Sequence, residues 1–118
     1  VMGVGGIVIN SVDSDLIFDG SGFTALFSPE TIITADYTIS NTDCTYNLLP
    51  NAAVTITVPD GLTSGFRCTV LNIGSGSVII NGSGTTDITL TAGQMCNIHV
   101  MNNKVRTSPI TTPTLIST

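Results

Sequence analysis

Three Gly-Ser-Gly triplets are the first feature with a possible chemical role, because glycine-rich loops can cradle phosphate groups. They lie at 20–22, 74–76 and 82–84. A phosphate-binding loop ends in Gly-Lys-Ser/Thr and leads into a helix, but the chain has a single lysine, Lys104, far from all three triplets. The dinucleotide fingerprint also needs a strand before it and a helix after it, and "GVGG" at 3–6 has neither. The sequence therefore predicts that the triplets are turns.

Acidic residues before the first triplet resemble a calcium loop. They are Asp13, Asp15 and Asp19. An EF-hand loop counted from Asp13 needs an oxygen ligand at its fifth position, glycine at its sixth and glutamate at its twelfth. The chain has other residue types there, namely Ile17, Phe18 and Thr24. We expect a solvated acidic turn, with an irregular calcium site as the alternative.

The remaining candidates for catalysis are one histidine and scattered carboxylates. His99 has serines and aspartates elsewhere in the chain, but no G-x-S-x-G elbow accompanies it. A glycosidase needs two paired carboxylates, whereas the acids are spread singly through predicted turns: Asp36, Asp43, Asp60 and Asp87. We assign no catalytic, cofactor-binding or metal residue, and expect His99 to be a partly exposed strand or subunit-interface residue. A small hydrolase is the least favoured function.

The cysteines indicate neither disulfides nor a metal site. Cys44, Cys68 and Cys96 are odd in number and have no C-x-x-C spacing. One histidine cannot complete a metal site with them. We expect three free, buried thiols in a protein made in a reducing cytoplasm.

Composition points to a subunit that contacts neighbours. Of 118 residues 42% are hydrophobic and only 9% are charged, against about 25% charged in average proteins. Three cations in a net charge of −5 are too few for a nucleic-acid groove. No apolar run reaches the roughly 20 residues of a membrane span. Val1 is a residue before which initiator Met is commonly trimmed, so we expect a complete small gene product.

Hydrophobic residues alternate with a period of two, which is typical of strands. The clearest runs are "VTITV" at 54–58, "FRCTV" at 66–70, "DITLT" at 87–91 and "MCNIHV" at 95–100. Pro59-Asp60-Gly61 predicts a tight turn, and Asn81-Gly82 predicts a hairpin. We expect 66–73, 77–81 and 87–91 to form an antiparallel meander. No window favours an amphipathic helix.

The pattern divides the chain into three parts. Residues 1–30 hold short apolar runs between glycines and are expected to form an N-terminal arm. Residues 31–107 hold the alternating strands and are expected to form an all-β, antiparallel sandwich or barrel-like core. Residues 108–118, "SPITTPTLIST", are uncharged and contain two prolines, so we expect an extended tail.

Residues 35–107 resemble a β-rich module found in bacteriophage tail fibres, tail spikes and capsid decoration or head-fibre proteins. The matching elements are "YT" at 37–38, "VTITVP" at 54–59, "GFRCTVLNIGSGSVII" at 65–80, "AGQ" at 92–94 and "NNK" at 102–104. The family often has Asn-x-Trp at the last of these, and this chain has no Trp. The resemblance implies a virion module that commonly assembles as a trimer and carries no catalytic residues.

The combined expectation is a structural virion protein of a bacteriophage that decorates the capsid. It would be made in the host cytoplasm, would bind the major capsid protein or other virion proteins, and would use no cofactor. Its arms would dock on the capsid or on a neighbouring subunit. The alternative is a tail-fibre or tail-spike module that binds host glycan, for which Tyr37 and Tyr46 are the plausible aromatic platforms.

Overall fold

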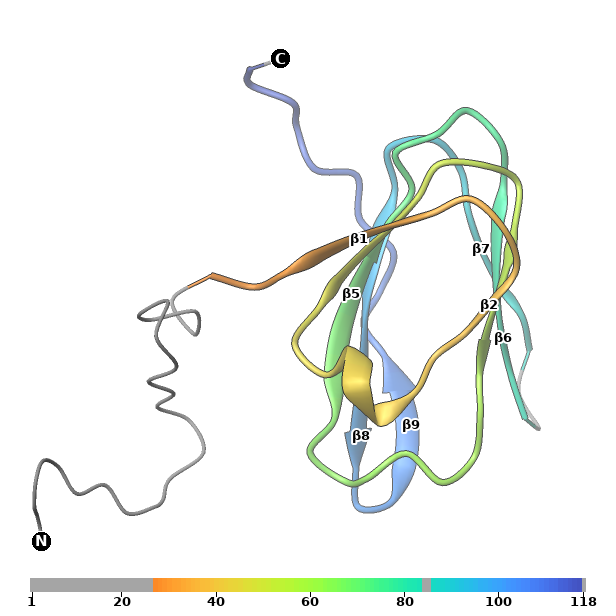
Figure 1. The fold of residues 1–118 in the computed structure, drawn as a ribbon. Coiled ribbons are helices and arrows are strands. Elements are labelled where there is room, and N and C mark those ends of the chain that lie inside the picture. Colours follow the sequence, from red (N-terminus) through yellow and green to blue (C-terminus); the bar gives the residue numbers. More distant parts are fainter. Residues whose placement is uncertain (1–26, 84–85, 118) are drawn as a thin grey trace, which may run out of the picture.

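The computed structural model describes residues 27–83 and 86–117, which form nine strands and one short 3-10 turn (Figure 1). The strands are β1 (Glu30–Ile33), β2 (Tyr37–Thr38), β3 (Asn47–Pro50), β4 (Thr55–Val58), β5 (Arg67–Leu71), β6 (Val78–Gly82), β7 (Ile88–Leu90), β8 (Met95–Met101) and β9 (Lys104–Thr107), and the turn is η2 (Asn41–Asp43). The expected all-β class is confirmed for this part of the chain.

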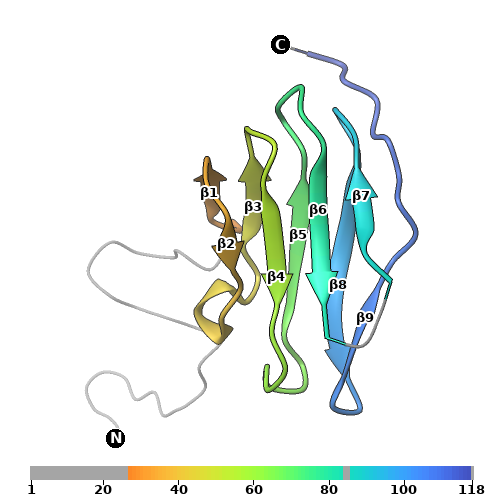
Figure 2. The same ribbon diagram turned by 90° about the vertical axis from the view of Figure 1, so that its right-hand side faces the viewer.

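The strands form two sheets that share one core. The five-stranded sheet has the order β1-β3-β5-β8-β9, and the four-stranded sheet has the order β2-β4-β6-β7. Figure 2 looks onto the four-stranded sheet, with the larger sheet behind it. Inward side chains from both sheets, such as Leu48, Val70 and Ile98 facing Ile56, Ile80 and Leu90, are at most 3% exposed.

The expected antiparallel arrangement is wrong for the first six strands. The chain crosses from one sheet to the other after each of β1 to β5, so successive strands of one sheet run in the same direction. The pairs β1–β3, β3–β5, β2–β4 and β4–β6 are all parallel. The predicted meander fails for its first pair, because β5 and β6 lie in different sheets, whereas its second pair, β6 and β7, is antiparallel as expected. Both sheets are therefore mixed.

The direction reverses only in the last three strands. β7 returns antiparallel to β6, β8 pairs antiparallel with β5, and β9 pairs antiparallel with β8. The β8–β9 hairpin has Asn102 and Asn103 at φ 55° and 59°, the left-handed conformation that two-residue hairpin turns require. The "NNK" element at 102–104 thus contains a two-residue hairpin turn, whereas Asn81-Gly82, predicted to form a hairpin, lies within β6 rather than in a tight turn.

The period-two pattern correctly identified the buried faces of the four runs in which it was found, which correspond to β4, β5, β7 and β8. In β4, β5 and β8 the exposure alternates strictly along the strand. Cys68 and Cys96 face the core as expected, but Cys44 is only partly buried because it follows η2 at one end of the sheets. All three thiols are free.

The C-terminal tail first continues along β8 beyond β9 and then leaves the sheet (Figures 1 and 2). Thr111 and Met95 exchange two backbone hydrogen bonds, at 2.8 and 3.0 Å. The Ser108 hydroxyl accepts a hydrogen bond from the Asn97 N–H at 2.8 Å. Beyond these contacts, Leu115 and Ile116 are 79% and 91% exposed. Only the first part of the tail is hydrogen-bonded to the sheet.

Candidate functional site

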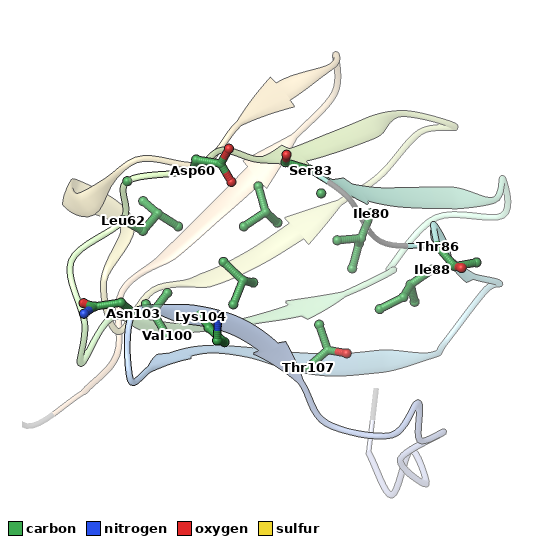
Figure 3. A pocket seen from close by; sticks show the side chains of 14 residues that line it. Asp60, Leu62, Ile80, Ser83, Thr86, Ile88, Val100, Asn103, Lys104 and Thr107 are labelled. Carbon is green, nitrogen blue, oxygen red and sulfur yellow. The ribbon is translucent and has the colours of Figure 1, made fainter.

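One concave region lies between the two sheets, on the side where β7 and β9 are the outer strands. It has a volume of about 620 Å³. Its floor is apolar and includes Leu62, Ile80, Ile88, Val100 and Val105. Figure 3 shows Asp60 and Ser83 on one wall and Lys104 and Thr107 on the other. With one acid and one cation on opposite walls, the cavity suits an apolar polypeptide segment better than a reaction centre.

A second, shallower region lies on the outer face of the five-stranded sheet and has a volume of about 270 Å³. Strand register places Asn47, Thr69 and Asn97 side by side on three neighbouring strands. The Thr69 hydroxyl donates a hydrogen bond of 2.7 Å to Asn97 Oδ1. The lining also includes Tyr46, Arg67 and His99. This groove offers hydrogen-bond donors and acceptors, one aromatic ring and one fixed positive charge.

Arg67 lines this groove, and the other two cations, Lys104 and Arg106, lie on β9, two strands away in the same sheet. Arg67 on β5 is opposite His99 on β8, which is opposite Arg106 on β9. Lys104 lies two residues before Arg106 on the same strand. Since the chain has no other Lys or Arg, its positive charge is concentrated on the β5–β8–β9 side of one sheet. The alternation had placed His99 on this outer face, and the structure confirms that position.

The triplet at 74–76 is held by Asn72 and leads into strand β6, not into a helix. The buried Asn72 side chain donates to the Gly76 and Leu90 carbonyls at 2.7 and 3.0 Å, and accepts from the Gly74 N–H at 3.0 Å. Gly74 and Gly76 lie against residues 51–53, which belong to the loop between β3 and β4. A Cβ at either position would be 2.9 Å from an atom of that loop. These glycines are therefore needed for the close approach of the two loops. The triplet at 20–22 and Gly84 of the third triplet lie outside the described residues.

The described carboxylates have separate structural roles. Buried Asp43 accepts hydrogen bonds from the Tyr37 hydroxyl at 2.7 Å and from the Ser40 N–H at 3.0 Å. The bond to Asp43, together with burial, raises the pKa of Tyr37 to about 12. Asp36 accepts from the Thr55 N–H, and Asp87 accepts from the Asn81 amide. Tyr37 is thus engaged in the fold, which leaves Tyr46 as the aromatic residue beside the groove. The aspartates at 13, 15 and 19 lie outside the described residues.

The buried thiols are poor nucleophiles. Burial, followed by the nearby Asp43 carboxylate, raises the pKa of Cys68 to about 12. Burial alone raises the pKa of Cys96 to about 11. A protonated thiol does not attack electrophiles or bind metals readily. Among residues 27–83 and 86–117, no three His, Cys, Asp or Glu side chains lie close enough together to hold a metal ion.

Sequence reasoning missed Asn72, Asp43 and the polar groove. The groove depends on register between strands that are distant in the sequence, and alternation within one strand does not fix register. A buried asparagine or aspartate looks like any turn residue in a chain so rich in both. In the described part of the chain, no helix has the length and apolar character needed to span a membrane. Comparisons with protein-family models, with curated proteins and with solved structures gave no match.

Proposed function

We propose that this chain is a structural virion protein of a bacteriophage, without enzymatic activity, that binds the capsid surface as a decoration protein. In this proposal its two sheets form a β-sandwich module that assembles as a homotrimer in the virion. The partners are the major capsid protein or neighbouring virion proteins. The sequence resemblance over 35–107 supports this role.

The observation that carries the proposal is the C-terminal tail. Its first part is attached to β8 through Ser108 and Thr111. Its last part presents Leu115 and Ile116, which are the most exposed large hydrophobic residues of the tail. Exposing two adjacent large aliphatic side chains is unfavourable in water, and it is explained if they are covered by another protein. The tail therefore has the properties of a docking arm.

Docking arms would stabilise a shell mechanically. An extended segment adds backbone hydrogen bonds and buried area to a partner without a core of its own. A protein that contacts adjacent capsomers must be detached before those capsomers separate, so it raises the free energy needed to open the shell. The other proposed arm is the N-terminal segment 1–30, of which residues 1–26 lie outside the described residues.

Location and copy number in purified particles test the proposal directly. Quantitative mass spectrometry should find the protein on the head, in a copy number comparable with that of the major capsid protein. Stripped capsids should rebind the purified full-length protein. The Leu115→Ser/Ile116→Ser variant should bind at least about tenfold more weakly, which is about 1.4 kcal/mol. A Thr114→Ser/Ser117→Ala variant is the matched control and should bind normally.

Deletion of residues 1–25 should also abolish capsid binding without unfolding the β core, as judged by circular dichroism. If both the tail variant and this deletion bind capsids with unchanged affinity, neither segment is a docking arm. If the protein is found on the phage tail rather than on the phage head, the decoration role is wrong.

The second candidate is a glycan-binding module, and the groove on the five-stranded sheet favours it. Protein–sugar contacts combine an aromatic platform with amide and hydroxyl groups, and Tyr46, Asn47 and Asn97 lie in this groove beside Arg67. The cation suggests an acidic sugar. Binding to an array that includes sialylated and uronic-acid oligosaccharides, lost in Arg67→Ala, would support this function. If no oligosaccharide on the array binds, the glycan-binding function is wrong.

A further inference from the structure

The two outer strands of the five-stranded sheet carry opposite charges. Within the described residues, β1 and β9 each pair with one strand only, on opposite sides of the sheet. β1 carries Glu30, and Asp36 follows it closely. β9 carries Lys104 and Arg106, which are two of the three lysine and arginine residues of the chain. Unpaired strand edges readily add another strand, and these two edges have complementary charge.

The strand directions allow the two edges to join as one continued sheet. β1, β3 and β5 are parallel, and the two antiparallel steps from β5 to β8 and from β8 to β9 return β9 to the direction of β1. The β1 edge of one copy can therefore pair in parallel with the β9 edge of another copy that has the same orientation. The resulting contact uses different surfaces on the two copies.

The free backbone groups also match. Asn47 and Asn51 donate to the carbonyls of Pro29 and Ile33, so the odd-numbered residues of β1 face β3. By alternation, the N–H and C=O groups of Glu30 and Ile32 point outward. On β9, the Ser108 N–H donates to the Asn97 carbonyl, so even-numbered residues face β8. The groups of Val105 and Thr107 then point outward and can bond to those of β1.

Side-chain orientation agrees with the same register. Arg106 lies opposite His99 on the outer face, and Val105 lies opposite the buried Val100. On β1, Ile33 is buried, so Glu30 and Ile32 are on the outer face. If the four residues of β1 align with the four of β9, Glu30 lies opposite Lys104 and diagonal to Arg106, while Ile33 and Thr107 face inward. No side chain changes face.

From these four agreements we infer that copies of this chain associate head to tail, with the β1 edge of one copy adding to the β9 edge of the next. The seated copy also lies beside the 620 Å³ cavity, because β9 contributes to its lining and Val105 of that lining is 39% exposed. Such a contact closes into a ring or continues as a fibre, depending on the rotation between copies. The inference deepens the proposed self-assembling role and rests on it.

Charge reversal of the full-length protein tests this contact by sedimentation equilibrium over a concentration series. Glu30→Lys alone, and Lys104→Glu/Arg106→Glu alone, should each weaken self-association at least about tenfold. Mixing the two variants should restore association in a 1:1 ratio, because only contacts between unlike variants then join opposite charges. A ring of three cannot alternate two variants, so a wild-type trimer held by this contact should be replaced by even-numbered assemblies. The Glu30→Lys/Lys104→Glu/Arg106→Glu variant should associate by itself.

Arg67→Glu is the matched control, because it reverses a charge on the same face but in the middle of the sheet. It should associate like the wild type, and unchanged circular dichroism should show that every variant is folded. A monomeric wild type, unaffected single-edge variants, or a mixture that stays dissociated would each overturn the inference. Association without capsid binding would refute the decoration role alone, whereas capsid binding by a monomer would refute the head-to-tail contact alone.

Discussion

Asn72 fixes the connection between the sheets at the scale of a single side chain. It has 0% exposure, and its amide bonds to Gly76, Leu90 and Gly74, so it joins the loop after β5 to the end of β7. A buried amide without partners costs about 1–3 kcal/mol for each unsatisfied group. The three bonds therefore stabilise one particular path of the chain from one sheet to the other.

Asn72→Ala should lower the free energy of unfolding by about 3 kcal/mol, because it leaves the buried partners of the amide unpaired. Urea denaturation measures this change. Asn81→Ala is the control, since the Asn81 amide bonds to Asp87 near the surface and its loss should cost less than about 1 kcal/mol. Equal losses in the two variants would show that Asn72 has no special role.

Tyr37 should make stability depend on pH in the alkaline range. Its bond to Asp43, with burial, raises its pKa from 10 to about 12 in the folded protein. A raised folded-state pKa gives stability that is complete below pH 10 and is lost as pH rises towards 12. Tyr37→Phe should be less stable than the wild type by about 1 kcal/mol at pH 7, and this difference should disappear by pH 12. Cys68 and Cys96 titrate in both proteins, so the comparison isolates Tyr37; a constant difference would contradict the assignment.

At the scale of elements, Gly74 and Gly76 let two loops pack directly against each other. The ideal Cβ positions of these residues lie 2.9 Å from the Asn51 carbonyl carbon and from the Ala53 Cβ. Such distances require something to move. The loop after β3 and the loop after β5 both cross from the five-stranded to the four-stranded sheet, at the same end of the sheets. Contact between them therefore sets the distance between these two crossings.

Gly74→Ala and Gly76→Ala should each destabilise the protein by about 1–3 kcal/mol through overpacking. Ser75→Ala, between them and exposed, should change stability by less than about 0.5 kcal/mol. The clash at Gly76 involves the Ala53 side chain, so Ala53→Gly should recover part of the Gly76→Ala loss but none of the Gly74→Ala loss. Thermal denaturation of the single and double variants measures this, and equal recovery at both sites would disprove the proposed contacts.

The sequence predicted the strands and their buried faces but not their partners, and the loop that contains these two glycines shows why. Alternation in 54–58, 66–70 and 95–100 identified strands and their buried faces, because both depend on neighbours within one strand. The partner of each strand depends on where the connecting loop leads. The predicted meander makes 74–76 a turn between adjacent strands, whereas Asn72 and the close approach of Gly74 direct this loop across to the other sheet. For the same reason the polar groove, built from three strands in register, could not be foreseen.

At the scale of the whole molecule, charge and attachment are distributed unevenly. The cations are confined to β5 and β9, while the described acids lie on β1, at Asp36 and Asp43 near β2, and at Asp60 and Asp87 beside the four-stranded sheet. In the C-terminal tail, Ser108 and Thr111 are hydrogen-bonded to β8, and the residues after Thr112 expose their apolar side chains. One sheet therefore has a charged edge for a neighbour, and the tail extends away from its strands.

Two truncations should separate the attached part of the tail from its free part. Ending the chain after Thr112 should leave the free energy of unfolding within about 0.5 kcal/mol of the wild type, because it removes none of the hydrogen bonds to β8. Ending it after Thr107 removes the bonds of Ser108 and Thr111 to Asn97 and Met95, and should cost about 1–3 kcal/mol. Urea denaturation distinguishes these outcomes. Capsid binding should be lost in both truncations, since both lack Leu115 and Ile116. If the protein that ends after Thr112 is as unstable as the one that ends after Thr107, the last residues pack on the core. The tail would then be part of the fold rather than an arm.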